Sequence, residues 1–510
     1  MNCGTGVSRR GFLTAAGVGT GMALAPVAFA EAADGQTETK VITGHLDPGV
    51  PDFVYLPVQV PSGVSQISVV YSYDRPTVPS GTPGNSCDVG VFDALGTELG
   101  GPGFRGWSGG FRDRFSISNT EATPGYLPGD VMPGVWNIVL GPYQVAPQGM
   151  NYNVEVTLTY GQPGVPYQPN YPPAKAAGRG RAWYRGDCHL HTVYSDGKRL
   201  PEEVAAGARE AKLDFITSTD HNTSASHGVW GPLAGSDLLI MLGEEITTRN
   251  GHWLALGLQP GQFIDWRYRS RDGEIQNYQR DIHQVGGLCV AAHPYCPWVA
   301  CNFKFGYDDF DAVEVWNGPW TWDDDATVST WDNMLVESVR GDGRWLPAMG
   351  NSDAHNPGHV IGLPQNVVLA DALTRDAILA GIKAGRNWLA ESAAVDVSFA
   401  VSGPRGQSAG IGERLEVASG DKVAVRLDVK GVPNGTVRLI TDEGQVRQAS
   451  LPASGEGTVN WLTTPAVSAY VRAEVRHPQA DGTAGGPALS PGLNFGAMAA
   501  MTNPIFLGGR

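Results

Sequence analysis

Short apolar runs alternate with helix-like stretches between residues 182 and 392, and this pattern constrains the fold more than any other feature of the sequence. Helical periodicity is clearest over 201–212 and 374–385. Such alternation predicts parallel strands with helices outside them, in a barrel or a doubly wound sheet. In both folds, catalytic groups gather at the carboxyl ends of the strands. The expected strands are 213–219, 238–242, 253–257, 288–292, 312–316 and 346–350.

Patterns typical of β structure flank this α/β segment. Residues 40–160 contain short β-prone runs separated by Gly- and Pro-rich turns, which predicts an N-terminal β-sandwich or jelly roll. Residues 161–181 form a Pro-rich linker, because closely spaced prolines disfavour both helix and central strand. Residues 393–510 return to the β pattern and predict a C-terminal β-sandwich with a tail. A chain of 510 residues is expected to form several such domains.

The first 30 residues are similar to a twin-arginine signal peptide. Arg9 and Arg10 stand before Gly-Phe-Leu, an apolar run of small residues follows, and Ala28-Phe29-Ala30 predicts cleavage before Glu31. The run is too short and too rich in glycine to span a membrane. We therefore expect the twin-arginine machinery to export the protein to the periplasm or beyond, with no stable membrane anchor.

Charge and cysteine content limit the partners and the cross-links. The net charge of −15 makes nucleic acid and anionic membranes unexpected partners, because these need a basic surface. Of the five cysteines beyond the leader, only Cys296 and Cys301 are close enough in sequence to suggest a disulfide, and the pattern leaves their bridging open. Cys188 and Cys289 lie in apolar runs and are interpreted as buried thiols.

Residues that bind metal ions cluster at the ends of the expected strands. His189 and His191 are one residue apart, so on an extended strand they point to the same face and can bind one ion. A lone histidine is more often structural, but nine of the eleven histidines fall in this one segment. Mixed imidazole and carboxylate ligands suit Zn, Mn or Fe, and they do not suit Ca.

The ordered motifs between Asp187 and His355 resemble the PHP superfamily, named for polymerase and histidinol phosphatase domains. The resemblance is greatest to the branch that contains the carbaryl hydrolases, which also have flanking β domains, and the C-terminal residues 501–505 share it. It implies a distorted, TIM-like barrel of seven strands that holds two or three divalent ions. It also implies phosphoesterase-like hydrolysis of a small-molecule ester.

The resemblance implies nine metal ligands, which are His189, His191, Asp196, His221, Glu245, His252, His293, Asp353 and His355. Glu245 would bridge two ions. The first would also be held by His189, His191 and Asp353, and the second by His252 and His293.

A third ion would use Asp196, His221 and His355. Many relatives have histidine near position 196, so whether this site is filled stays open. Asp196 has an alternative role as the cap of the helix that begins near Pro201.

Two acidic residues near the ligands need separate interpretations. Glu244 and Glu245 are neighbours on a strand and face opposite ways, so we expect Glu244 to point away from the ions. Asp187 has two readings of equal weight. It either hydrogen-bonds a ligand histidine or the reacting water, or it is a solvated residue at the start of a strand.

Further residues are candidates for substrate binding and proton transfer. Arg249, Asn222 and Asn317 are expected to line the substrate pocket. Glu245, as the bridging ligand, and His221 or His355, as proton donor to the leaving group, are the expected catalytic residues. The remaining histidines of the segment match no ligand position and are expected at the surface or behind the ligands.

These observations predict an exported hydrolase that uses metal-activated water. The segment has no Gly-x-Ser-x-Gly motif and no Walker loop, which disfavours serine hydrolases and nucleoside triphosphatases. The superfamily favours phosphate esters, and the branch favours carbamates or carboxylic esters. A secreted binding protein with a structural metal is the alternative of another class, but a structural zinc needs about four ligands, whereas nine are present.

Overall fold

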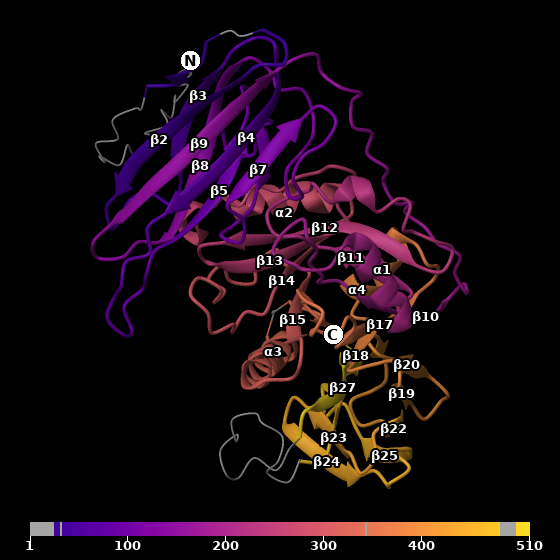
Figure 1. Cartoon of the computed structure of the whole chain (residues 1–510). Helices are drawn as coiled ribbons and strands as arrows, with labels where there is room; N and C mark the ends of the chain where they lie inside the picture. The colour runs from indigo at the N-terminus through magenta and orange to yellow at the C-terminus, as the bar shows by residue number, and fades with distance from the viewer. Residues whose placement is uncertain (1–24, 31–32, 342–343, 480–495, 510) are drawn as a thin grey trace, which may run out of the picture.

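A computed structural model describes residues 25–30, 33–341, 344–479 and 496–509. The protein is of mixed α/β type, with far more strand than helix, and Figure 1 shows three successive regions along the molecule. Two sheets form the N-terminal region, a long sheet with helices forms the middle, and a smaller pair of sheets forms the C-terminal region. Among the described residues, no helix combines the length and the apolar character needed to cross a membrane.

The N-terminal region consists of two sheets that pack face to face. One sheet has the order β1 (Val27–Ala28), β3 (Val54–Val60), β8 (Gly134–Gln144), β5 (Ser86–Phe92) and β6 (Phe104–Trp107). The other has the order β2 (Thr37–Leu46), β9 (Met150–Tyr160), β4 (Val64–Tyr73) and β7 (Arg114–Ser118). Apolar residues alternate along β9 and point into a core shared by both sheets, where Trp136 of β8 is fully buried.

The end of the expected signal peptide lies against this region. Most of that peptide, including the twin arginines, falls outside the described residues. Val27 and Ala28 pair in parallel with β3, and Phe29 is buried in the core of the two sheets. Cleavage before Glu31 would therefore remove a short strand that the structure packs in place.

The central sheet carries the strands expected from the α/β pattern. Its order is β16 (Ala348–Asn351), β15 (Ala312–Asn317), β14 (Leu288–Ala291), β13 (Gly251–Leu256), β12 (Leu239–Thr248), β11 (Phe215–Ser218) and β10 (Ala182–Asp187). The helices that accompany it are α1 (Pro201–Glu210), α2 (Ile275–Gln284), α3 (Trp322–Arg340) and α4 (Arg375–Lys383), with 3₁₀ turns at His227–Val229 and Ser270–Asp272. Proline in the first turn favours the start of α1, and the Glu203 carboxylate accepts a hydrogen bond from the Leu200 backbone there.

One strand runs against the expected direction. β13 is antiparallel to both of its neighbours, whereas β10, β11 and β12, like β14, β15 and β16, are mutually parallel. The expectation of a parallel strand at 253–257 is therefore wrong. The reason is the connection, since only two residues join β12 to β13, and so short a link permits a hairpin but no crossover.

The two ends of this strand order approach each other. An isolated parallel bridge joins Leu190, just after β10, to Ala354, just after β16. β10 also pairs with β17 (Gln365–Ala370), which pairs with β18 (Asn387–Ala390). The ladder thus continues beyond the seven strands.

The C-terminal region is joined to the central sheet by strand pairing. From β18 the sheet runs on through β27 (Met498–Thr502), β26 (Tyr470–Arg476), β23 (Thr436–Thr441) and β24 (Gly444–Ser450), with β28 (Ile505–Leu507) and β21 (Arg414–Leu415) at its side. A second sheet of β20 (Ser408–Gly410), β19 (Asp396–Ser402), β22 (Val423–Lys430) and β25 (Gly457–Thr463) shares a core with it. The expected second sandwich is therefore continuous with the α/β region.

Candidate metal centre

The expected ligands converge because they follow the carboxyl ends of neighbouring strands. His189 and His191 come after β10, His221 follows β11, His293 follows β14, and Asp353 follows β16. The β12–β13 hairpin adds Glu245 and His252 from the same edge of the sheet. The strand ends thus bring together side chains that lie up to about 160 positions apart in the sequence.

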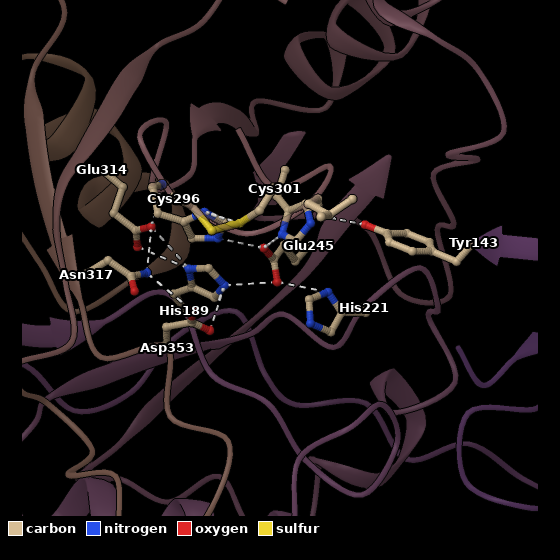
Figure 2. Close-up of a disulfide and its surroundings, with 12 residues drawn as sticks. Tyr143, His189, His221, Glu245, Cys296, Cys301, Glu314, Asn317 and Asp353 are labelled. Atoms are coloured by element: carbon tan, nitrogen blue, oxygen red, sulfur yellow. Dashed lines mark hydrogen bonds and ion pairs between the residues drawn. A yellow bond between two sulfur atoms is a disulfide. The ribbon is translucent and has the colours of Figure 1, made fainter. Parts of the chain in front are cut away.

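Glu245 lies at the centre of the cluster, as Figure 2 shows. Its Oε2 atom is 3.0 Å from His189 Nε2, 3.2 Å from His191 Nε2 and 3.0 Å from His221 Nδ1. Its Oε1 atom is 2.9 Å from His252 Nδ1 and 3.1 Å from His293 Nε2. The two carboxylate oxygens therefore face two separate sets of imidazoles, as a bridging ligand requires.

Asp353 completes the first of these sets. Its Oδ1 atom is 2.9 Å from His191 Nε2, 3.2 Å from His189 Nε2 and 3.4 Å from His355 Nδ1. Asp353 and His293 have φ angles of 48° and 25°, in the left-handed region that residues with a Cβ rarely adopt. Such backbone conformations persist where the surrounding structure enforces them, which is common at functional sites.

Asp196 belongs to a third set of side chains. Its Oδ1 atom is 3.3 Å from His355 Nε2 and 3.6 Å from His221 Nε2. The alternative role as a helix cap is wrong, because the residue before α1 is Leu200 and the acid at that end is Glu203. All nine expected ligands are thus brought together.

The cluster has the properties of a site for divalent ions. Five of its inward-facing atoms are buried and have no hydrogen-bond partner among the described residues: His189 Nε2, His191 Nε2, Asp196 Oδ1, Glu245 Oε2 and Asp353 Oδ1. Buried polar atoms without partners are rare and costly, so their convergence indicates a ligand that satisfies them. Imidazole nitrogen and carboxylate oxygen are the donors that zinc, manganese and iron accept. The residues present therefore fit the ions that the sequence implies.

The carboxylates and imidazoles of the cluster shift one another's pKa values. Burial would raise the pKa of Glu245, but His221, His189 and His252 outweigh it and hold this pKa well below its usual range. Burial would likewise lower the pKa of His189, but Asp353, Glu245 and Glu314 raise it well above the ordinary value. Cations bound here would take the place of these shared protons.

Glu314 on β15 supports the ligands, and the sequence analysis did not single it out. Its carboxylate lies 3.1 Å from His189 Nδ1 and accepts hydrogen bonds from the backbone N–H of His293 (3.1 Å) and from the amides of Asn351 (2.8 Å) and Asn317 (3.1 Å). A carboxylate on the far nitrogen of a ligand histidine fixes the ring and its tautomer. The sequence did offer one sign of its role, because Glu314 is a charged residue inside an otherwise apolar strand.

A second buried acid, Asp220, was also missed. It accepts hydrogen bonds from the backbone and hydroxyl of Thr192 and from the Ser195 hydroxyl. Ser195 Oγ in turn lies 3.4 Å from His191 Nδ1. Asp220 therefore holds the loop that follows the first two histidines, and its position next to His221 was the available sign.

Two other acids of the site now have defined positions. Glu244 points away from the cluster, as expected, and accepts a hydrogen bond from the backbone N–H of Ile264. Asp187 is fully buried, so the solvated reading is wrong, and it bonds the backbone N–H of His189 but neither a ligand ring nor the cluster. Its other donors are Ser352 and Gly362.

A cavity of about 520 Å³ opens beside the cluster. Asp196, His221 and His252 line it, together with Asn222 and Arg249 of the expected pocket residues. Asn317 is not among its lining residues. It lies instead against Glu314 and 3.4 Å from Asp353 Oδ2, so its expected place in the pocket is corrected to one beside the ligands.

The structure joins Cys296 and Cys301 in a disulfide next to the cluster (Figure 2). Cys301 Sγ lies 3.5 Å from His293 Nδ1. The bridge closes the loop directly after His293 and forms part of the cavity wall. Cys188 and Cys289 are buried thiols, as expected.

Comparison with known proteins gives only distant likenesses. No family model and no curated protein matches the chain. A two-domain protein from Bacteroides vulgatus containing a predicted PHP-like metal-dependent phosphoesterase is 16% identical, with a TM-score of 0.34 over 61% of this chain and 95% of its own. A predicted metal-dependent phosphoesterase from Bifidobacterium adolescentis is 20% identical, with a TM-score of 0.25 over 41% of this chain and 96% of its own.

An amidohydrolase from Chromobacterium violaceum, with bound sulfate and no metal, is 17% identical, with a TM-score of 0.24 over 35% of this chain and 89% of its own. These scores are too low to establish a shared function. What the site can do follows from its geometry.

Proposed function

We propose that the protein is an exported, metal-dependent hydrolase of the PHP type that acts on phosphate esters. One observation carries the proposal, namely the convergence of five buried ligand atoms without hydrogen-bond partners around Glu245, whose two oxygens face separate sets of histidines. Nine ligands exceed what a structural ion needs, which disfavours a binding protein with a merely structural metal.

The ligands divide into the sets that two or three ions need. His189, His191 and Asp353 would hold one ion with Glu245, and His252 and His293 would hold a second. Divalent ions held by these residues would lower the pKa of a coordinated water toward neutrality and so supply an activated water as the nucleophile. A third set, Asp196, His221 and His355, would hold a third ion.

The chain's own residues provide orientation and a proton. Glu314 holds the His189 ring, and Asp220 holds the loop that carries His191. His221 lines the cavity whereas His355 is not among the lining residues, so His221 is better placed to protonate a leaving group when no third ion engages it. Cys301 of the disulfide and residues of the N-terminal sheets line the cavity on this side of the cluster.

Carbamates and carboxylic esters are a second candidate class. The cavity wall includes the rings of Phe53, Trp107, Phe111 and Trp266, which suit an apolar aryl group. Hydrolysis of either class uses the same activated water, so only substrate preference separates them.

The test is a metal-analysed preparation assayed against a phosphomonoester, a phosphodiester, an aryl ester and an aryl carbamate. We expect chelation to abolish hydrolysis, Zn or Mn to restore it, and the phosphate esters to be preferred. Full activity in metal-free protein would refute the mechanism. A preference for the carbamate or the aryl ester would move the assignment to the second class.

Export and barrel closure are part of the same proposal. The twin arginines support export, and replacing Arg9 and Arg10 with lysine should retain the precursor in the cytoplasm. Unchanged export of that variant would contradict this point.

The bridge between Leu190 and Ala354 supports closure of β10–β16 into a distorted seven-stranded barrel. Cysteines placed at Leu190 and Ala354 that fail to cross-link would refute it.

A further inference from the structure

The N-terminal sheets form one wall of the cavity beside the metal cluster. Asp88 of β5, Trp107 of β6 and Tyr143 of β8 face the same cavity as His221 and His252. A substrate whose reacting bond lies at the cluster therefore places its remaining part against this wall. The wall defines a subsite separate from the metal ligands.

Asp88 is the unpaired charge of this wall. Its side chain has no hydrogen bond and no ion pair within 4.0 Å among the described residues, although the residue is half-buried. Burial raises the pKa of this carboxyl to about 7, against the opposing effect of Arg249. A carboxylate that is partly removed from water and has no partner is destabilised, and a bound cation would offset that cost.

The other charged groups of the wall are already engaged. Asp52 forms an ion pair with Arg269 at 2.7 Å. Arg249 donates to the Tyr143 backbone carbonyl at 2.8 Å, and its guanidinium lies over the Tyr143 ring at 4.3 Å. Asp88 is thus the carboxylate that a ligand can address.

An aromatic ring adjoins Asp88. A Cβ added to Gly141 would lie 2.7 Å from the Trp107 ring and 3.2 Å from the Asp88 Cβ, so both side chains pack against this glycine, and 5% of Trp107 stays exposed. The Trp107 ring is braced by Trp266 and Phe53, whose ring centroids lie 4.8 Å and 6.0 Å away. A fixed tryptophan next to a carboxylate is the combination that binds organic ammonium groups.

We propose that this wall is a substrate subsite in which Asp88 and Trp107 hold an organic ammonium group while the ester lies at the metal cluster. The substrate class is then a phosphate ester of an amino alcohol. The inference rests on the proposed hydrolase function for the ester part, but recognition of the ammonium group rests on the wall alone.

The test compares two substrates of equal shape. Choline phosphate and 3,3-dimethylbutyl phosphate differ by a positively charged nitrogen in place of a neutral carbon. With the metal-loaded full-length protein, we expect kcat/KM to favour choline phosphate by about tenfold or more. Asp88→Asn should abolish this preference. Asp113→Asn removes the same charge from an exposed position on the same pair of sheets and should keep it.

Calorimetry with choline and its neutral analogue 3,3-dimethylbutan-1-ol separates the two proposals. Preferential binding of choline that Asp88→Asn abolishes, without hydrolysis of either phosphate, would uphold the subsite and overturn the phosphoesterase assignment. Hydrolysis of both phosphates with equal kcat/KM would overturn the subsite and uphold the enzyme. If the Asp88 variant does not fold, the wild-type ratio of the two substrates decides alone.

Discussion

At the scale of single residues, Glu244 and Glu245 show how position decides the role of identical side chains. Both are buried on β12. Strand alternation turns Glu245 toward five histidines, which lower its pKa despite burial, and Glu244 toward the Ile264 backbone, where burial raises its pKa. The first lies among imidazoles, and the second lies against a backbone amide.

The first prediction compares conservative changes at these two positions. Glu245→Gln should lower both metal content and turnover, the latter by at least about two orders of magnitude, because changes behind the ligands alone already cost 10–100-fold. Glu244→Gln is the matched control and should keep the metal stoichiometry. Plasma mass spectrometry of the two purified proteins measures this, and depletion in the Glu244 variant only would reverse the assignment.

Glu314 gives a second prediction at this scale. Glu314→Gln keeps the shape of the side chain but weakens its hold on the His189 ring, so metal affinity should fall about 10–100-fold. Competition with a chromophoric chelator measures the affinity. Glu337→Gln, an exposed change on α3, is the control. Equal affinities in the two variants would show that Glu314 does not position the ligand.

At the scale of elements, the cluster depends on how strand ends are joined. The β12–β13 hairpin places His252 close to Glu245, and a parallel strand at that point would have carried the histidine away from it. Asp187 also joins separate elements of the site through its hydrogen bonds. From the end of β10 it accepts hydrogen bonds from Ser352 after β16 and from Gly362 before β17.

The third prediction follows from these contacts. Asp187→Asn replaces an acceptor with a group that is half donor, so at least one buried N–H or hydroxyl loses its partner. We expect a loss of about 1–3 kcal/mol in stability and lower metal content, since His189 and Asp353 flank this joint. Calorimetric melting and metal analysis measure both effects. Asp371→Asn, at an exposed position after β17, should change neither, and a wild-type melting temperature for the Asp187 variant would contradict the role.

At the scale of the whole molecule, a buried ion network attaches the C-terminal region to the α/β region. Glu474 of β26 contacts Arg472 at 2.8 Å and Arg476 at 3.3 Å. These arginines in turn reach Asp332 and Asp325 on α3, at 2.7 Å and 2.8 Å. Burial would raise the pKa of Glu474, but the arginines, Arg472 foremost, lower it to about 2.

The fourth prediction is the pH dependence of this attachment. The pKa of Glu474 is about 2 in the fold against 4.5 for the free side chain. Because the folded pKa is depressed, the stabilisation is complete above pH 4.5 and is lost as pH falls toward 2. Glu474→Gln should destabilise the fold by about 3–5 kcal/mol at pH 7, because it removes the buried carboxylate that Arg472 and Arg476 share.

Calorimetric melting should show that the difference in the free energy of unfolding between the wild type and Glu474→Gln narrows as the pH falls from 4.5 to 3. Glu456→Gln, an exposed change on the same region, serves as the control. A difference that is constant with pH would contradict the assignment.

The sequence by itself pointed to the residues that the fold brings together in the cluster. Histidine pairs on a strand, acids at strand ends and the alternation of β12 are local features, so they follow from residue type and a period of two or of 3.6. The resemblance of the ordered motifs implied the nine ligands, and strand alternation predicted the outward turn of Glu244. The supporting contact of Glu314 with His189 was not predicted, and the only sign of it in the sequence was a charged residue within an apolar run.

The tertiary structure alone decided the cavity wall, the continuous C-terminal sheet and the attachment through Glu474. Each depends on contacts between residues far apart in the chain, such as Asp88 and Arg249 on one cavity or Glu474 and α3 on one network. Local propensity does not predict which of these distant residues come into contact, because the packing of whole sheets against one another sets the distance between them. The substrate's surroundings are therefore a property of the assembled fold, whereas the ligands are a property of the strands.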